Sequence, residues 1–187
     1  SAYKFFGPHM GMLWADKSLF EGLPAFKVRP ATDELPFRWM TGTPNFEGIA
    51  GTVAAIQYLA SLGSEEKDLR SQLTLAFERI RKHEFDLMVQ LIEGLQSIKG
   101  VRIWGITDPE QFEARVPTLS ITHDRFSTTE LAKLLAEKGI FVWSGNHYAL
   151  QFCEFCDLEP GGTLRIGILH YNTAEEVQRL LTELATL

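Results

Sequence analysis

Apolar residues recur at the spacing of a helix through the middle of the chain. The first such stripe consists of Ile49, Val53, Ile56 and Leu59. It predicts a helix over residues 46–62, which Gly63 ends. A longer stripe predicts a second helix over residues 64–98, with Ser64 as its N-cap and Gly100 beyond its end. A helix of that length is unusual inside a globular domain and favours a connection between two domains.

After residue 100, short apolar runs alternate with short helical stripes. Four runs predict β-strands, at residues 101–106, 118–122, 140–143 and 163–168. Two helices are predicted from capping boxes, formed by Ser127 with Glu130 and by Thr173 with Glu176. Strands that alternate with helices over so short a stretch predict one compact α/β unit.

The first 45 residues follow no such regular pattern. Residues 10–15 form an apolar run between a Gly-Pro pair and two charged residues, which predicts a strand. Residues 16–45 hold four prolines and few periodic apolar positions, which predicts a long loop or arm. Loops of that length are uncommon in compact domains unless they are functional or pack on another part of the protein.

Composition and charge exclude several classes of protein. The chain has 187 residues, of which 45% are hydrophobic, so it can form one good core or two small ones. The formal net charge is -6, and no run of Lys and Arg is dense enough to form a nucleic-acid stripe, so we expect no nucleic-acid partner. We also expect no membrane partner, because no apolar stretch approaches the ~20 residues of a membrane span. With no signal-peptide pattern at the N-terminus, we expect a cytoplasmic protein.

Cys153 and Cys156 form a single C-x-x-C pair. A zinc site would need two further ligands at matching spacing, and the sequence has no second C-x-x-C and no H-x3-H, so we expect no metal. Two interpretations stay open, namely inert and partly buried thiols, or a redox dithiol.

Several residues suit chemistry, although each also has a structural explanation. Lys4 is either a solvated terminal lysine or a lysine that forms a Schiff base with a carbonyl cofactor. Gly42-Thr43-Pro44 precedes a helix, where free N–H groups can bind phosphate, but an N-cap turn explains it too. Arg165 lies inside an apolar strand, so its charge needs either an acidic partner or a ligand carboxylate.

Four motifs, in order along the chain, resemble a known family. They are S-A-Y-K-x-x-G-P-H, R-W-x-T-G-T-P-N, G-N-H-Y-A and L-R-I-G-x-x-H-Y-N-T-x-E-E. Together they resemble the C-terminal half of the class V aminotransferases, which are fold-type I enzymes dependent on pyridoxal 5'-phosphate (PLP). The cysteine desulfurase-like group is the nearest, and the resemblance covers essentially the whole chain.

The resemblance implies a cofactor role for each matching residue near the N-terminus. Lys4 matches the lysine that binds PLP covalently and later acts as a general base. Ser1 matches a serine that holds the cofactor phosphate, while Tyr3 stands where desulfurases usually carry His. Thr43, next to Gly42, matches a threonine that reaches the phosphate of the neighbouring subunit, which implies a homodimer.

The resemblance also implies a substrate site later in the chain. Arg165 matches the arginine that clamps the α-carboxylate of an amino-acid substrate, and His147 and Tyr148 belong to the same site. Desulfurases of the selenocysteine-lyase type carry a nucleophilic cysteine in G-H-H-C-A, where this chain has Tyr148. A phenol cannot take up sulfur as a persulfide, and Cys153 and Cys156 lie five and eight residues further on. Desulfurase chemistry is therefore not expected.

The architecture that the resemblance implies is an α/β fold in two parts. Residues 1–63 match the end of the large cofactor-binding domain. Residues 64–187 match a long connecting helix and a small α+β domain, with a mixed or antiparallel sheet and helices on one face. In that architecture Lys4 and Arg165 meet in one cleft.

We therefore expect the C-terminal portion of a PLP-dependent enzyme that acts on an amino acid by transamination, elimination (lyase chemistry) or racemisation. The family's N-terminal half would carry the ring that stacks on PLP and the Asp that pairs with the pyridine nitrogen. Without it, we expect the 187 residues alone to be inactive. The alternative is a non-catalytic interaction or dimerisation module that retains the small-domain fold.

Overall fold

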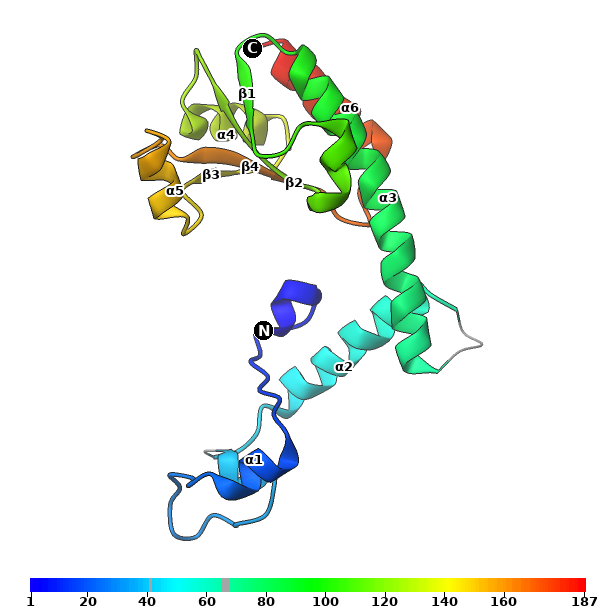
Figure 1. Cartoon of the computed structure of the whole chain (residues 1–187), viewed down its shortest axis with the longest axis vertical. Helices are drawn as coiled ribbons and strands as arrows, with labels where there is room; N and C mark the ends of the chain where they lie inside the picture. The colour runs from blue at the N-terminus through cyan, green and yellow to red at the C-terminus, as the bar shows by residue number, and fades with distance from the viewer. Residues whose placement is uncertain (41, 65–67) are drawn as a thin grey trace. The chain divides into compact units, whose positions relative to one another are not determined.

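The computed structural model describes residues 1–40, 42–64 and 68–187 (Figure 1). These residues form two compact units, which we call unit 1 (Ser1–Ala76) and unit 2 (Phe77–Leu187). Among the described residues, none of the helices combines the length and the apolar character that a membrane crossing requires.

Unit 1 is built around α2 (Phe46–Ser61), which confirms the first predicted helix. Asn45 caps this helix, because its side-chain oxygen accepts a hydrogen bond from the N–H of Gly48 at 2.8 Å. Gly51 on α2 leaves room for the ring of Pro8, since a Cβ at residue 51 would lie only 3.2 Å from that ring. The N-terminal segment therefore packs directly on this helix.

The strand predicted at residues 10–15 is wrong. That segment has no regular secondary structure. All four strands of the described residues belong to unit 2, so residues 10–15 have no neighbouring strand to pair their N–H and C=O groups with.

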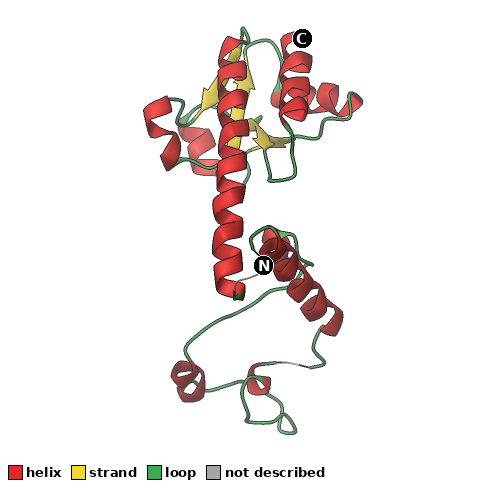
Figure 2. Cartoon of the chain, turned by 90° about the vertical axis from the view of Figure 1, so that its right-hand side faces the viewer, coloured by secondary structure: helices red, strands yellow, loops and turns green. Residues whose placement is uncertain are grey.

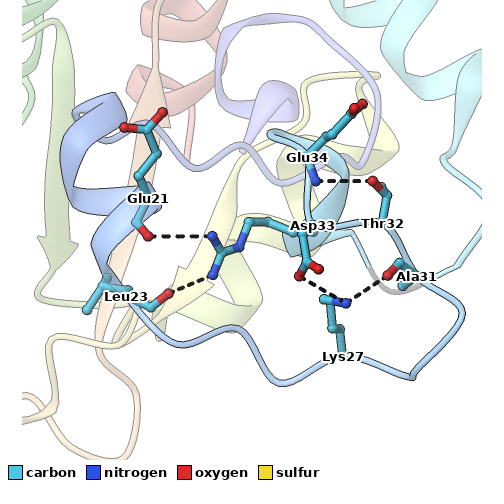
Figure 3. A network of polar contacts seen from close by, with 8 residues as sticks. Glu21, Leu23, Lys27, Ala31, Thr32, Asp33 and Glu34 are labelled. Carbon is cyan, nitrogen blue, oxygen red and sulfur yellow. Dashed lines mark hydrogen bonds and ion pairs between the residues drawn. The ribbon is translucent and has the colours of Figure 1, made fainter.

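The long loop predicted over residues 16–45 is interrupted by α1 (Lys17–Gly22) and by the short 3-10 helix η2 (Phe37–Trp39). Figure 3 shows the polar contacts that hold the segment between them. The ammonium group of Lys27 donates to the Ala31 carbonyl at 2.7 Å and lies 3.1 Å from the Asp33 carboxylate.

Arg38, at the far end of this segment, donates from its guanidinium to the Leu23 carbonyl at 3.0 Å. Because these bonds satisfy backbone carbonyls that no helix or strand uses, they give the segment a defined course.

α3 (Leu69–Ser97) confirms the long helix but begins later than predicted. Asp68 caps it, because its carboxylate accepts hydrogen bonds from the N–H groups of Arg70 at 3.1 Å and Ser71 at 3.2 Å. The predicted N-cap, Ser64, lies before the helix, and residues 65–67 lie outside the described residues.

Unit 2 contains one antiparallel sheet with the strand order β1-β2-β4-β3. The strands are β1 (Val101–Trp104), β2 (Thr118–His123), β3 (Trp143–Gly145) and β4 (Thr163–Gly167). The sequence predicts a strand over residues 140–143, whereas pairing begins only at Trp143. Ile140 instead donates its N–H to the Leu135 carbonyl and so belongs to the end of the preceding helix.

Both capping boxes are confirmed, at the starts of α4 (Thr128–Glu137) and α6 (Ala174–Ala185). Two further elements follow no sequence signal used above, namely η3 (Pro109–Ala114) and α5 (Leu150–Phe155). Six residues are too few to display a helical stripe, which explains why the pattern did not predict α5.

The hydrophobic core of unit 2 lies between one face of the sheet and the helices α3, α4 and α6 (Figures 1 and 2). On β2 and β4, the register pairs Leu119 with Ile166 and Ile121 with Leu164, and all four side chains are buried. These three helices cover one face of the sheet. Exposed side chains that could bind a ligand are therefore to be sought on the other face.

Gly94 lies in the interior of α3, where glycine costs about 1 kcal/mol relative to alanine. A Cβ at this position would collide with the side chain of Leu181 on α6, which is buried. The glycine therefore allows α6 to approach α3 closely.

We expect Gly94→Ala to lower the free energy of unfolding by about 1–3 kcal/mol, because the displaced Leu181 side chain is confined by the core. In a Leu181→Ala background the same change should be neutral or stabilising by up to about 1 kcal/mol, since only the gain in helix propensity remains. Urea denaturation of the four proteins measures both values. An equal cost in the two backgrounds would contradict this account of Gly94.

Candidate functional site

The sheet face opposite the core carries a row of polar and aromatic side chains. Arg165 lies between the buried residues Leu164 and Ile166, so strand alternation places it on this outer face, where it is exposed. The register sets Ser120 of β2 directly opposite Arg165 on one side and Trp143 of β3 on the other. Residues directly opposite each other share a face, so all three belong to the outer face.

Trp104 of β1 pairs with Ser120 and completes what we call the outer row: Trp104, Ser120, Arg165 and Trp143. The indole of Trp104 is held in place, because its Nε1 donates to the Thr122 hydroxyl at 3.0 Å. The Arg102 guanidinium lies 3.8 Å from the centre of the Trp104 ring. At the same end, α5 adds an edge-on contact from Phe152, with ring centres 6.0 Å apart.

The guanidinium of Arg165 makes no hydrogen bond and no ion pair with any residue that the structure describes. The sequence left two alternatives for this charge, an acidic partner or a ligand carboxylate. The described residues supply no acid, and Arg165 is exposed, so its guanidinium is accessible to a ligand carboxylate, which it can bind through two parallel N–H···O bonds.

His147 lies close enough to Arg165 for the two charges to interact. The pKa of His147 is lowered, first by burial and further by the positive charge of Arg165, while a hydrogen bond to Thr163 acts against both. Nε2 of His147 lies 3.2 Å from the Thr163 carbonyl oxygen, which can only accept, so we assign the proton to Nε2. In the neutral ring, Nδ1 then keeps its lone pair and can accept a hydrogen bond.

The turn that carries His147 and Tyr148 has an unusual backbone. Their φ angles are 53° and 63°, in the left-handed region that non-glycine residues rarely adopt. Asn146 holds the turn, because its side-chain oxygen accepts from the N–H of Tyr148 at 3.1 Å and its amide donates to the Glu159 carboxylate at 3.0 Å. The Tyr148 side chain is fully exposed, so no burial compensates for the strain.

The two cysteines lie on or next to α5 rather than at residue 148, and Cys153 is poorly suited to act as a nucleophile. Cys153 is 1% exposed, and the pKa of its thiol is raised, chiefly by burial and also by the negative charge of Glu159. Cys156 is partly buried at the end of α5. The described part of the chain holds no group of three or more metal-binding side chains. The burial of Cys153 and its raised pKa favour inert thiols over a redox dithiol.

Unit 1 places the predicted cofactor lysine in the short 3-10 helix η1 (Ala2–Phe5). Lys4 is exposed, and its side-chain amine makes no hydrogen bond or ion pair with a described residue; Nζ lies 5.9 Å from the centre of the Tyr3 ring. The Tyr3 ring in turn lies 5.4 Å from the ring of His9. Ser1 precedes the helix, and its side chain makes no capping hydrogen bond.

η1 itself is fixed by Ala2, which is completely buried. The N–H of Ala2 donates to the Met10 carbonyl at 2.8 Å, and the Ala2 carbonyl accepts from the N–H of Gly7 at 2.9 Å. This turn holds the backbone next to Lys4 while leaving the lysine side chain free to react.

Gly42 and Thr43 lie before α2 in the same unit. Gly42 has a φ of 116°, which favours glycine, and Thr43 is exposed with no hydrogen bond from its hydroxyl to a described residue. Asn45 provides the N-cap of α2, so capping does not use Thr43. Among the described residues, no hydrogen bond or ring contact joins this pair to residues 1–4.

The lowered pKa of His147 makes a prediction about stability. The folded-state pKa of His147 lies below its unfolded-state value of about 6.5, so the unfolded chain binds more protons than the folded chain as the pH falls through this range. The part of the free energy of unfolding that depends on a neutral His147 is therefore fully present above about pH 6.5 and is lost as the pH falls. We expect the native protein to lose more stability than His147→Gln between about pH 7 and pH 5. Urea denaturation across that range, with His9→Gln as control, measures the difference. Parallel curves for the native protein and His147→Gln would contradict the assignment of a neutral imidazole.

Comparison with known proteins places this chain in a family. The chain is 30% identical over 193 residues to a probable cysteine desulfurase of Mycobacterium leprae, and the match covers 97% of this chain and 42% of that protein. The chain thus spans less than half the length of this and other curated relatives that it matches.

Solved structures show the same fold. A cysteine desulfurase from Escherichia coli superposes with a TM-score of 0.74 at 24% identity, covering 98% of this chain and 43% of that one. A NifS-like protein gives a TM-score of 0.69 at 26% identity, covering 100% of this chain and 44% of that one. The predicted fold class, a part of the PLP fold type I, is therefore confirmed. Since the family model for class V aminotransferases matches residues 1–180, this chain belongs to the class V aminotransferase family.

Proposed function

We propose that this chain carries the cofactor lysine and the substrate-binding arginine of a PLP-dependent enzyme that acts on an amino acid. Arg165 carries the proposal, because it is an exposed cation on the outer face of the sheet without an acidic partner among the described residues. Such a guanidinium is suited to the α-carboxylate of an amino acid. Binding through two bonds would fix the orientation of the substrate as well as its position.

The residues of unit 1 fit PLP, on which the family depends. Lys4 offers an exposed amine for covalent attachment, and the hydroxyls of Ser1 and Thr43 are available for a phosphate. When bound, PLP supplies an electron sink for the reaction. Lys4 would hold the cofactor and then move a proton at its Nζ. The match of Thr43 to a residue that serves the neighbouring subunit supports a homodimer.

Tyr148 reduces the number of reaction types that we propose for this chain. It stands where desulfurases of the selenocysteine-lyase type have their nucleophilic cysteine, and the buried thiol of Cys153 does not replace that group. We therefore propose transamination, elimination (lyase chemistry) or racemisation of an amino acid, in a cytoplasmic enzyme, rather than transfer of sulfur. The 187 residues alone should not turn over an amino acid, since the chain spans only 42% of its relative.

Covalent trapping tests the cofactor assignment. After incubation with PLP and reduction with borohydride, we expect the pyridoxyl label to lie on Lys4, because this amine is exposed and the turn around it is fixed. Peptide mass spectrometry locates the label. Lys17 is the matched control, since its side chain is 80% exposed on α1: Lys17→Arg should keep the labelling and Lys4→Arg should abolish most of it. Equal labelling of Lys4 and Lys17 would refute the assignment.

A second candidate function is association without catalysis. Unit 1 exposes large apolar side chains, with Leu13 82%, Trp14 88% and Phe26 96% exposed. Phe26 lines a hollow of about 910 Å³ together with Val28, Phe37, Met40 and Phe46. Exposed apolar patches of this kind mark interaction surfaces. We propose that a second copy of the chain covers this hollow in the homodimer.

We expect Phe26→Glu to weaken self-association by roughly tenfold or more, because it places a charge in the apolar hollow. Sedimentation equilibrium measures the dissociation constant. Phe155→Glu is the control, since Phe155 is 89% exposed on α5 in unit 2. If the two variants associate alike, the hollow around Phe26 does not form the interface.

A further inference from the structure

We propose that Trp143 determines which amino acids bind at Arg165, by selecting those with an aromatic side chain. This inference deepens the proposed function and rests on it, because it takes Arg165 as the group that binds the substrate carboxylate. It adds the class of side chain that the substrate would carry.

The register of the sheet brings the two residues together. Trp143 on β3 and Arg165 on β4 lie directly opposite each other on the outer face. Adjacent strands are about 4.8 Å apart, and the Cβ atoms of such a pair are about 5 Å apart. Both side chains are long and rise from the same face. A carboxylate bound at the guanidinium therefore brings the rest of the ligand beside the indole.

The indole of Trp143 is available, unlike the other indole of the outer row. Trp143 is 70% exposed, and no described ring or cation contacts it. Trp104, at the far end of the row, is already engaged by Arg102 and Phe152 and is only partly exposed. Ser120, between Trp104 and Arg165, is too small to offer a comparable surface.

The chemistry of the row favours an aromatic ring over other side chains. An indole face attracts the edge of another ring, and aromatic pairs gain more than their buried area alone provides. Arg165 is the one charged residue of the row. The lowered pKa of His147 next to it favours the neutral imidazole, so the immediate surroundings of Arg165 match one carboxylate rather than two.

Binding of free amino acids to the 187-residue chain tests the proposal without any turnover. Nuclear magnetic resonance titrations with L-alanine, L-phenylalanine and L-glutamate follow the backbone signal of Arg165 and the indole signal of Trp143. We expect L-phenylalanine to bind roughly tenfold more tightly than L-alanine, the size expected for a good aromatic contact. Trp143→Ala should reduce this ratio to about one while leaving L-alanine binding unchanged, and Trp143→Phe should restore part of it.

Trp14→Ala is the matched control, because Trp14 is 88% exposed in unit 1 and should not affect the ratio. Equal binding of L-phenylalanine and L-alanine by the native chain, or tighter binding of L-glutamate, would overturn the role of Trp143 while leaving the carboxylate site intact. If no amino acid binds, or if Arg165→Ala leaves binding unchanged, the proposed function fails and this inference fails with it.

Discussion

The alternation of side chains along β4 is the constraint on which the candidate substrate site depends. Leu164 and Ile166 point into the core, so Arg165 between them must point to the outer face. A slip of one residue would bury the guanidinium and expose both apolar side chains, at a cost that no other part of the strand offsets. The core of unit 2 therefore determines where the cation lies.

The same constraint positions the neighbours of Arg165. β4 lies between β2 and β3, so the registers of its two pairings set Ser120 and Trp143 directly opposite Arg165. The three core helices cover only the opposite face, which leaves the outer row accessible. Binding groups on a rigid sheet need no reorganisation to meet a ligand, and this suits the role in orienting a substrate that we propose for Arg165.

Sequence patterns predicted the elements that depend on local signals and missed those that depend on distant partners. α2, α4 and α6 were predictable because each combines an apolar stripe with a capping residue. The apolar run at residues 10–15 looks like a strand, but pairing requires a neighbour that unit 1 lacks. Arg165 was recognisable from its place in an apolar strand, whereas Trp143 was not, because its position depends on the register between separate segments. The role of Lys4 rests on its motif alone.

The backbone of the turn at residues 145–148 is held by contacts that do not involve the side chain at position 148. Gly145 lies against Gly162, where a Cβ would collide with the Gly145 backbone, and Asn146 is tied to Glu159. These contacts hold the strained backbone, and the Tyr148 side chain takes no part in them because it is fully exposed. A cysteine and a tyrosine can therefore stand on the same turn at little difference in stability, since neither is packed. The chemistry at position 148 can change while the carboxylate site that we propose on β4 stays as it is, so relatedness to desulfurases does not by itself determine the reaction of this chain.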